Sequence, residues 1–94
     1  MEPQKNLIPG NTVFYVLKNG EIRPLVLTRI DPRSPNVNGV VHFDGPNDAE
    51  RLDAEIRSDL LRTGTLWLED IPYSEKAVAG TWHLPPAMAA AART

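Results

Sequence analysis

Apolar and polar residues alternate along several short runs of this chain, and turn-forming residues separate the runs. The runs are rich in valine, isoleucine, leucine, threonine and aromatic residues, which favour β-strands. Most of the nine prolines fall between the runs, because proline has no amide hydrogen to donate within a sheet. The pattern predicts four strands, followed by an irregular strand that Gly80 interrupts, at residues 12–18, 22–30, 37–43, 65–71 and 75–84.

Turn and breaker residues predict how the strands meet. Asn19-Gly20 lies between the first two runs, and both residues tolerate a positive φ, so we expect a β-hairpin there. Pro24 interrupts the second run, which places the first part of that strand at a sheet edge or in a bulge. Gly39 in the third run indicates a bulge or the close approach of another backbone.

The period of the pattern changes after the turn Asp44–Asp48. Asn47 and Glu50 are spaced as a capping box, and Gly64 is a natural helix end. Between them, apolar residues recur at steps of three and four, at Ala49, Leu52, Ile56 and Leu60. This spacing predicts one amphipathic helix over about residues 48–62.

Together these elements predict a mainly β fold: a small antiparallel SH3-like barrel with one inserted amphipathic helix. A β-sandwich or an open β+α sheet is the alternative. We expect a single domain at residues 11–86, with an N-terminal tail at 1–10 and an Ala-rich tail at 87–94. In a domain this small an enclosed active site has little room, so a ligand should bind in a surface groove or between subunits.

Composition narrows the classes of function. Hydrophobic residues make up 41% and charged residues 23%, as in soluble globular proteins. The net charge of −2 makes nucleic-acid binding unexpected, although a nucleic-acid-binding small barrel stays open if the arginines gather on one face. With no cysteine, disulfides and thiolate sites are excluded. No run is long enough to span a membrane and no signal peptide is evident, so we expect a soluble intracellular protein.

The chain contains the stretches GNTVFYVLKNGEIRPLVLTRI, VNGVVHFDGPND and LWLEDIPYSEKAVAGTWHLPP. They resemble small uncharacterised proteins encoded in tailed-phage and prophage genomes, which end in a closing G-T-W-H-x-P motif. The resemblance covers residues 10–86, whereas the segment Ala49 to Arg62 is longer than expected there and the Ala-rich tail has no counterpart. It implies a viral origin and a β-rich fold, and it assigns no catalytic residue.

Few residues have a spacing typical of catalysis. None of the serines lies in a G-x-S-x-G elbow, and the six glycines are scattered singly rather than grouped in a phosphate-binding loop. His42 and Asp44 are two residues apart, so on a strand both side chains point to one face. His83 could supply the third ligand of a metal site made of two histidines and one carboxylate. A strand end, a turn and packing beside Trp82 explain these three residues more simply. We therefore expect no enzyme, no cofactor and no metal site.

Aromatic and cationic residues are better candidates for binding. If the last two strands pair, the rings of Trp67 and Trp82 become neighbours, with Tyr73 close by. Such rings beside Arg29 or Arg23 could stack a base while the guanidinium contacts a phosphate. The alternative is that each tryptophan anchors the core.

The neighbours of Trp67 discriminate between these two alternatives. Leu66 and Leu68 must face opposite to Trp67 on a strand, so a leucine-filled core would leave the indole on the surface. The loop Asp44–Asp48 adds polar groups for recognition, or else serves only as a turn and helix cap. The candidate ligand-binding residues are Trp67, Trp82, His83, Arg29, Tyr73, Asp44, Asn47 and Asp48.

These features favour a non-enzymatic, phage-encoded binding module. A counter-defence protein of the host cytoplasm, expected to be a homo-oligomer, could sequester a nucleotide-like immune signal or block a host protein. The alternative is a minor virion or assembly protein that uses its sheet edges and aromatic residues for protein contacts.

Overall fold

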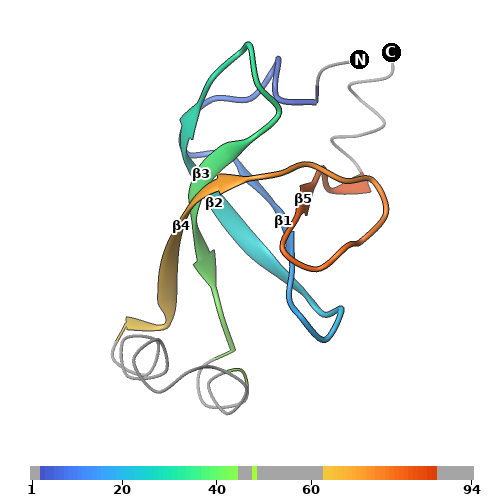
Figure 1. Ribbon diagram of the computed structural model, residues 1–94. Helices are drawn as coiled ribbons and strands as arrows, with labels where there is room; N and C mark the ends of the chain where they lie inside the picture. The colour runs from blue at the N-terminus through green and yellow to red at the C-terminus, as the bar shows by residue number, and fades with distance from the viewer. Residues whose placement is uncertain (1–2, 45–47, 49–62, 87–94) are drawn as a thin grey trace.

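The structure is a computed structural model that describes residues 3–44, 48 and 63–86 (Figure 1). It contains one antiparallel sheet with the strand order β4-β3-β2-β1-β5. The strands are β1 (Thr12–Val16), β2 (Ile22–Ile30), β3 (Val37–His42), β4 (Thr65–Ile71) and β5 (Trp82–His83). The predicted mainly β fold is confirmed, although β5 is much shorter than expected.

The helix predicted over residues 48–62 lies outside the described residues, apart from Asp48. Almost no residue in the described ranges is helical. No helix in that part of the chain is long and apolar enough to cross a membrane.

The β1–β2 hairpin forms where the Asn-Gly pair predicts it. The Gly20 N–H donates to the Leu17 carbonyl over 2.9 Å, and the Leu17 N–H donates to the Glu21 carbonyl over 2.8 Å. Gly20 has a φ of 87°, whereas Asn19 keeps a negative φ. The side chain of Asn19 instead accepts the Glu21 N–H over 3.0 Å. The turn therefore needs a positive φ at one residue only.

β2 and β3 lie so close together that only glycine fits at position 39. A Cβ on Gly39 would lie 2.6 Å from Leu25 Cδ1 and 2.7 Å from the Val26 carbonyl oxygen. The expected close approach is confirmed, and bulges interrupt the pairing of β3 with both of its neighbours. β2 is an inner strand, but it pairs with β3 only from Leu25 onward. Pro24 is therefore paired on one side alone, with Phe14 of β1, which agrees with the expected edge position on the side of β3 only.

The inward side chains of the strands form the hydrophobic core. Residues 3–10, which we expected as a tail, also take part in it. Leu7 belongs to the core cluster, and Gln4 is buried with its Nε2 donating to the Pro32 carbonyl over 3.1 Å. The packed domain therefore begins before residue 11. The buried cluster comprises Leu7, Val13, Leu25, Leu27, Val37, Val41, Ile71 and Trp82.

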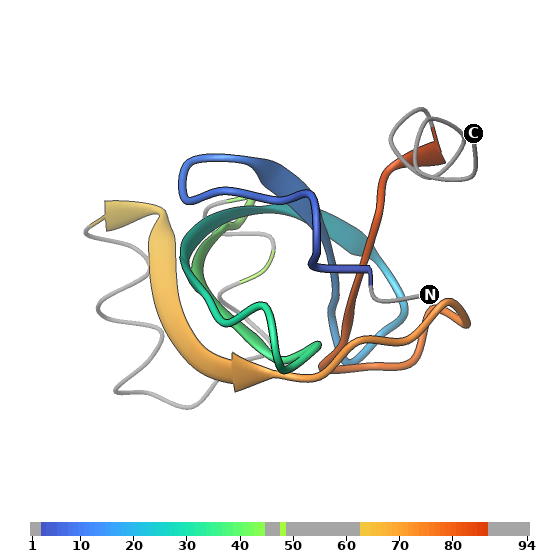
Figure 2. The same cartoon turned by 90° about the horizontal axis from the view of Figure 1, so that it is seen from above.

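The sheet curls strongly around this core (Figure 2). After β4, the Trp82 N–H donates to the Pro72 carbonyl over 2.9 Å, and the Ser74 N–H donates to the Trp82 carbonyl over 3.0 Å. An isolated bridge between Tyr73 and Trp82 accompanies these bonds. Among the described residues, however, β4 itself pairs with β3 alone. The sheet is therefore open, and the closed barrel that we expected is not formed.

Candidate functional site

Trp67 lies on the outer face of β4, away from the core. The residue is 54% exposed, whereas Leu66 and Leu68 are half-buried on the inner face of the same strand. The predicted alternation is confirmed, with the leucines inward and the indole outward. Strand pairing aligns Trp67 with one residue on each of three other strands: Val40, Val26 and Thr12.

A polar hollow of about 240 Å³ adjoins the row formed by Trp67 and the residues aligned with it. Asn38 is two residues before Val40 on β3, so the hollow and Trp67 share the outer face. Asp70 has a φ of 54°, a backbone conformation that non-glycine residues rarely adopt. The Asp70 N–H donates to Asn38 Oδ1 over 2.8 Å, and Asn36 Nδ2 donates to Asp70 Oδ1 over 2.9 Å. The lining residues are Arg29, Asp31, Ser34, Asn36, Asn38 and Asp70.

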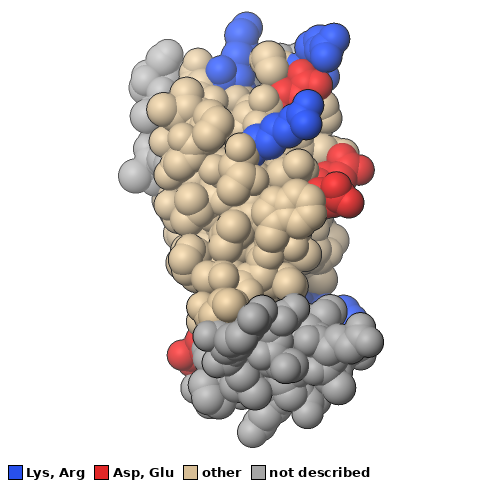
Figure 3. All heavy atoms as spheres, turned by 90° about the vertical axis from the view of Figure 1, so that its left-hand side faces the viewer, with Lys and Arg blue, Asp and Glu red and all other residues tan. Residues whose placement is uncertain are grey.

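The charges around the hollow are mixed. Hydrogen bonds from the backbone and side chain of Arg33, over 2.9 and 3.3 Å, lower the pKa of Asp31, and the positive charges of Arg33 and Arg29 add to this effect. Arg29 lines the hollow together with two acidic residues, Asp31 and Asp70, so the charges there have both signs. Figure 3 shows a broad uncharged area on the side that carries β4, with Lys and Arg side chains near its upper end.

Trp82 lies in the core rather than beside Trp67. It is 0% exposed, and its Nε1–H donates to the Pro35 carbonyl over 2.8 Å. The Tyr73 ring meets it edge-on, with centroids 4.9 Å apart. Trp67 faces outward from β4 and β4 does not pair with β5, so the expected patch of neighbouring tryptophan rings is wrong. Trp82 cannot contact a ligand at the surface, and Tyr73 packs against it.

His83 packs against Phe14, with ring centroids 5.6 Å apart and an interplanar angle of 78°. Its Nδ1 is buried without a hydrogen-bond partner among the described residues. Burial lowers the pKa of His83, because a buried imidazolium loses its hydration. The ring is therefore neutral at pH 7 and does not supply a positive charge for a phosphate.

Asp48 is held within the domain rather than presented to a ligand. Its nearly buried carboxylate accepts hydrogen bonds from Arg23 Nε over 2.9 Å and from Arg23 Nη2 over 2.7 Å. It also accepts the Asp44 N–H over 2.6 Å. Hydrogen bonding to Asp48 raises the pKa of Arg23, with a smaller contribution from Glu21. Arg23 and Asp48 are thus structural partners; Asp44 is exposed, and Asn47 lies outside the described residues.

The fold separates the two histidines that we considered as metal ligands. His42 ends β3 and His83 lies in β5, with β2 and β1 between them. Three strand spacings amount to roughly 14 Å, far too wide for one metal ion. Within the described ranges, no three acidic or histidine side chains are grouped so as to hold a metal.

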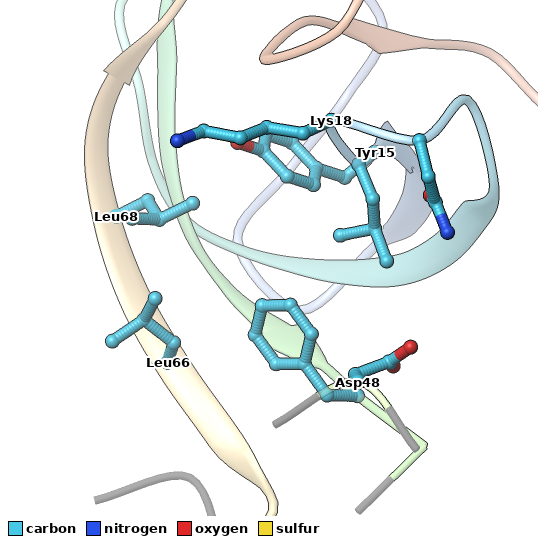
Figure 4. Close-up of a pocket in the computed structure, with 8 residues that line it drawn as sticks. Tyr15, Lys18, Asp48, Leu66 and Leu68 are labelled. Atoms are coloured by element: carbon cyan, nitrogen blue, oxygen red, sulfur yellow. The ribbon is translucent and has the colours of Figure 1, made fainter. Parts of the chain in front are cut away.

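An apolar groove on the inner side of the sheet was not predicted from the sequence. It has a volume of about 140 Å³ and lies between β4 and the end of the β1–β2 hairpin (Figure 4). Burial raises the pKa of Tyr15, which lines it. No motif signals this groove, because only the curvature of the sheet brings its residues together. They are Tyr15, Leu17, Lys18, Asn19, Phe43, Asp48, Leu66 and Leu68.

Comparison of the chain with protein-family models, with curated proteins and with solved structures found no match.

Proposed function

We propose that this chain is a non-enzymatic, phage-encoded module that binds a host protein through its outer face around Trp67. The observation that carries the proposal is an indole, 54% exposed, on an edge strand beside a polar hollow. Tryptophan and arginine are enriched among the residues that dominate protein–protein affinity. The resemblance to phage proteins supports a viral origin, and a counter-defence role in the host cytoplasm is part of the proposal.

A protein partner fits this surface better than a nucleotide. Nucleotide capture commonly combines aromatic rings that stack on the base with a positive charge that binds the phosphate. Trp67 is remote from Trp82 in the strand order, and Arg29 shares its hollow with two carboxylates. A protein surface that offers both donors and acceptors matches such mixed charge.

Affinity capture from the host bacterium tests the proposal. The tagged wild-type chain should enrich a partner that Trp67→Ala enriches at least tenfold less, because truncating a central tryptophan costs about 2 kcal/mol or more of binding free energy. Ile8→Ala is the matched control, since Ile8 is an exposed apolar residue (64%) in another segment. Binding of the purified partner with equal affinity to both variants would contradict the proposal.

Sequestration of a nucleotide immune signal is the second version of the binding module. The indole and the guanidinium of Arg29 on one face favour it. Titration calorimetry with cyclic oligonucleotides should then give heat with the wild type and none with Arg29→Ala. Absence of heat across a broad panel removes this version.

A minor virion or assembly protein would use the same surface for contacts between structural proteins. Mass spectrometry of purified virions separates this alternative from counter-defence, since a counter-defence protein should be scarce in virions. Nucleic-acid binding is the least favoured class because the net charge is −2.

We further propose that the domain is an incompletely closed relative of SH3-like barrels. Five short antiparallel strands and the backbone bonds between residues 72–74 and Trp82 support this assignment. Nuclear Overhauser contacts between Tyr73 and Trp82, together with none across the inner groove, would be expected in solution.

A further inference from the structure

The backbone of β4 has hydrogen-bonding groups directed away from the sheet. The Phe43 N–H donates to the Gly64 carbonyl over 3.1 Å, so Gly64 turns its carbonyl toward β3. Backbone groups alternate between the two sides of an antiparallel strand. The N–H and C=O groups of Thr65 and Trp67 therefore point outward from the sheet edge.

Only part of this edge is satisfied locally. The Thr63 hydroxyl accepts the Thr65 N–H over 3.2 Å and donates to the Thr65 carbonyl over 3.0 Å. In the part of the chain that the structure describes, no hydrogen bond engages the outward backbone groups of Trp67. Proline and lysine, which protect exposed edges in many proteins, are missing from the segment 65–69. Among the described residues, the outer side of the β4 backbone at Trp67 thus has no strand partner.

We propose that β4 pairs with β4 of a second copy of this chain, in antiparallel orientation about a two-fold axis at Trp67. This inference goes beyond the proposed function, because it is argued from the backbone groups of β4 and needs no host partner. The Trp67 N–H of each copy would donate to the Trp67 carbonyl of the other, which satisfies the open backbone groups. An isologous contact of this kind closes as a dimer.

The side chains of β4 are self-complementary in this register. Trp67 lies against the second copy's Trp67 on the outer face, and Leu66 lies against the second copy's Leu68 on the inner face. Glu69 lies opposite Thr65 rather than opposite another acid. The two Glu69 residues are then separated by four residues along the sheet, roughly 14 Å, beyond the screening length at physiological salt. A register centred on Leu68 would instead place each Trp67 against a Glu69.

The inner groove adds a second reason for this occupant. Leu66 and Leu68 line the groove and are only half-buried. A second β4 brings its own Leu66 and Leu68 to the same face, where they extend the apolar lining. The left-handed backbone at Asp70 and the bulge before it limit the pairing to residues 65–69. So short a contact makes the dimer a weak one.

Sedimentation equilibrium of the purified chain tests the association. The wild type should show a monomer–dimer equilibrium, and Trp67→Lys should raise the dissociation constant at least tenfold, because an edge lysine opposes strand pairing. Val78→Lys is the matched control, since Val78 is comparably exposed (52%) and lies outside the sheet. A wild type that stays monomeric at millimolar concentration overturns the proposal, as does equal weakening by both variants.

Disulfide crosslinking tests the register and leaves Trp67 in place. The chain has no cysteine, so introduced thiols report on one contact only. An oxidised mixture of Leu66→Cys and Leu68→Cys proteins should yield crosslinked dimers, since facing Cα atoms lie about 4.5 Å apart in such a pair. Each protein alone should crosslink no more than Val78→Cys. Crosslinking of Leu68→Cys with itself, or none in the mixture, overturns the register.

Discussion

The two tryptophans of this chain occupy opposite environments: Trp82 is buried in the core, and Trp67 lies on the surface. Trp82 has its indole N–H bonded to the Pro35 carbonyl and its ring covered by Tyr73. Trp67 belongs to a strand whose leucines already face the core, so its indole is left outside. The first residue stabilises the fold, and the second is available for contacts with other molecules.

Replacing Trp82 should therefore affect stability far more than replacing Trp67. Trp82→Phe removes buried ring volume and the hydrogen bond to Pro35, so the free energy of unfolding should fall by about 2–3 kcal/mol. Trp67→Phe should change it by no more than about 0.5 kcal/mol. Urea unfolding of both variants measures the difference, and similar losses would show that Trp82 is not the core anchor.

His83 should make the domain sensitive to acid. Its folded-state pKa is lower than its unfolded value, because burial disfavours the imidazolium. The unfolded chain therefore binds a proton first as the pH falls below about 6.5, and the free energy of unfolding decreases from there down to the folded-state pKa. Above this range the group contributes no pH dependence.

Unfolding midpoints measured between pH 7.5 and 5 check this expectation. His83→Asn should lose part of the acid-dependent decrease. Parallel slopes for the wild type and His83→Asn would show that another group causes the acid sensitivity.

At the scale of elements, one ion pair ties the start of β2 to the chain that follows β3. Asp48 is nearly buried, and its carboxylate is satisfied by Arg23 and by the Asp44 N–H. A buried carboxylate without a partner is costly, so Arg23 compensates for the burial of Asp48. The position of Asp48 therefore depends on a contact that no local pattern specifies.

Arg23→Ala should remove the charged partner of this nearly buried carboxylate and lower the free energy of unfolding by about 3 kcal/mol. Glu21→Ala should cost less than about 1 kcal/mol, because the Glu21–Arg23 pair is exposed on the Glu21 side. Thermal or urea unfolding measures both variants. A loss for Glu21→Ala as large as that for Arg23→Ala would place the stabilisation in the exposed pair instead.

At the scale of the whole molecule, the curvature of one sheet forms an inner groove and leaves β4 as an open edge. Residues 72–74 reach Trp82 of β5, whereas β4 remains an edge of the sheet. The same opening exposes the backbone of Trp67 and the inner side of Leu66. The open edge thus underlies the proposed dimer, whereas the outward indole of the proposed partner surface follows from the alternation of side chains along β4.

Fluorescence quenching should separate the two sides of this sheet in solution. A Trp82→Phe protein, which retains only Trp67, should be strongly quenched by acrylamide at low protein concentration, because its indole is exposed. A Trp67→Phe protein should be quenched severalfold less, since Trp82 is 0% exposed. Equal quenching would contradict the division into a core indole and a surface indole.

The strand pattern, the hairpin at Asn19-Gly20 and the close approach at Gly39 could all be predicted from the sequence. Each depends on neighbours along the chain or on the size of one side chain. The outward orientation of Trp67 followed from the same alternation, because Leu66 and Leu68 require the other face. These properties are local, so the sequence around each residue determines them.

Which strands are neighbours, and therefore which side chains meet, was decided only by the tertiary structure. β4 and β5 take opposite ends of the strand order, yet the curl of the sheet brings Tyr73, which follows β4, against Trp82. Trp67 faces outward and stands apart from both. The pairing of Arg23 with Asp48 and the inner groove arise in the same way. Contacts between distant residues depend on how the whole sheet curves to bury its apolar face, and no short stretch of sequence encodes that curvature.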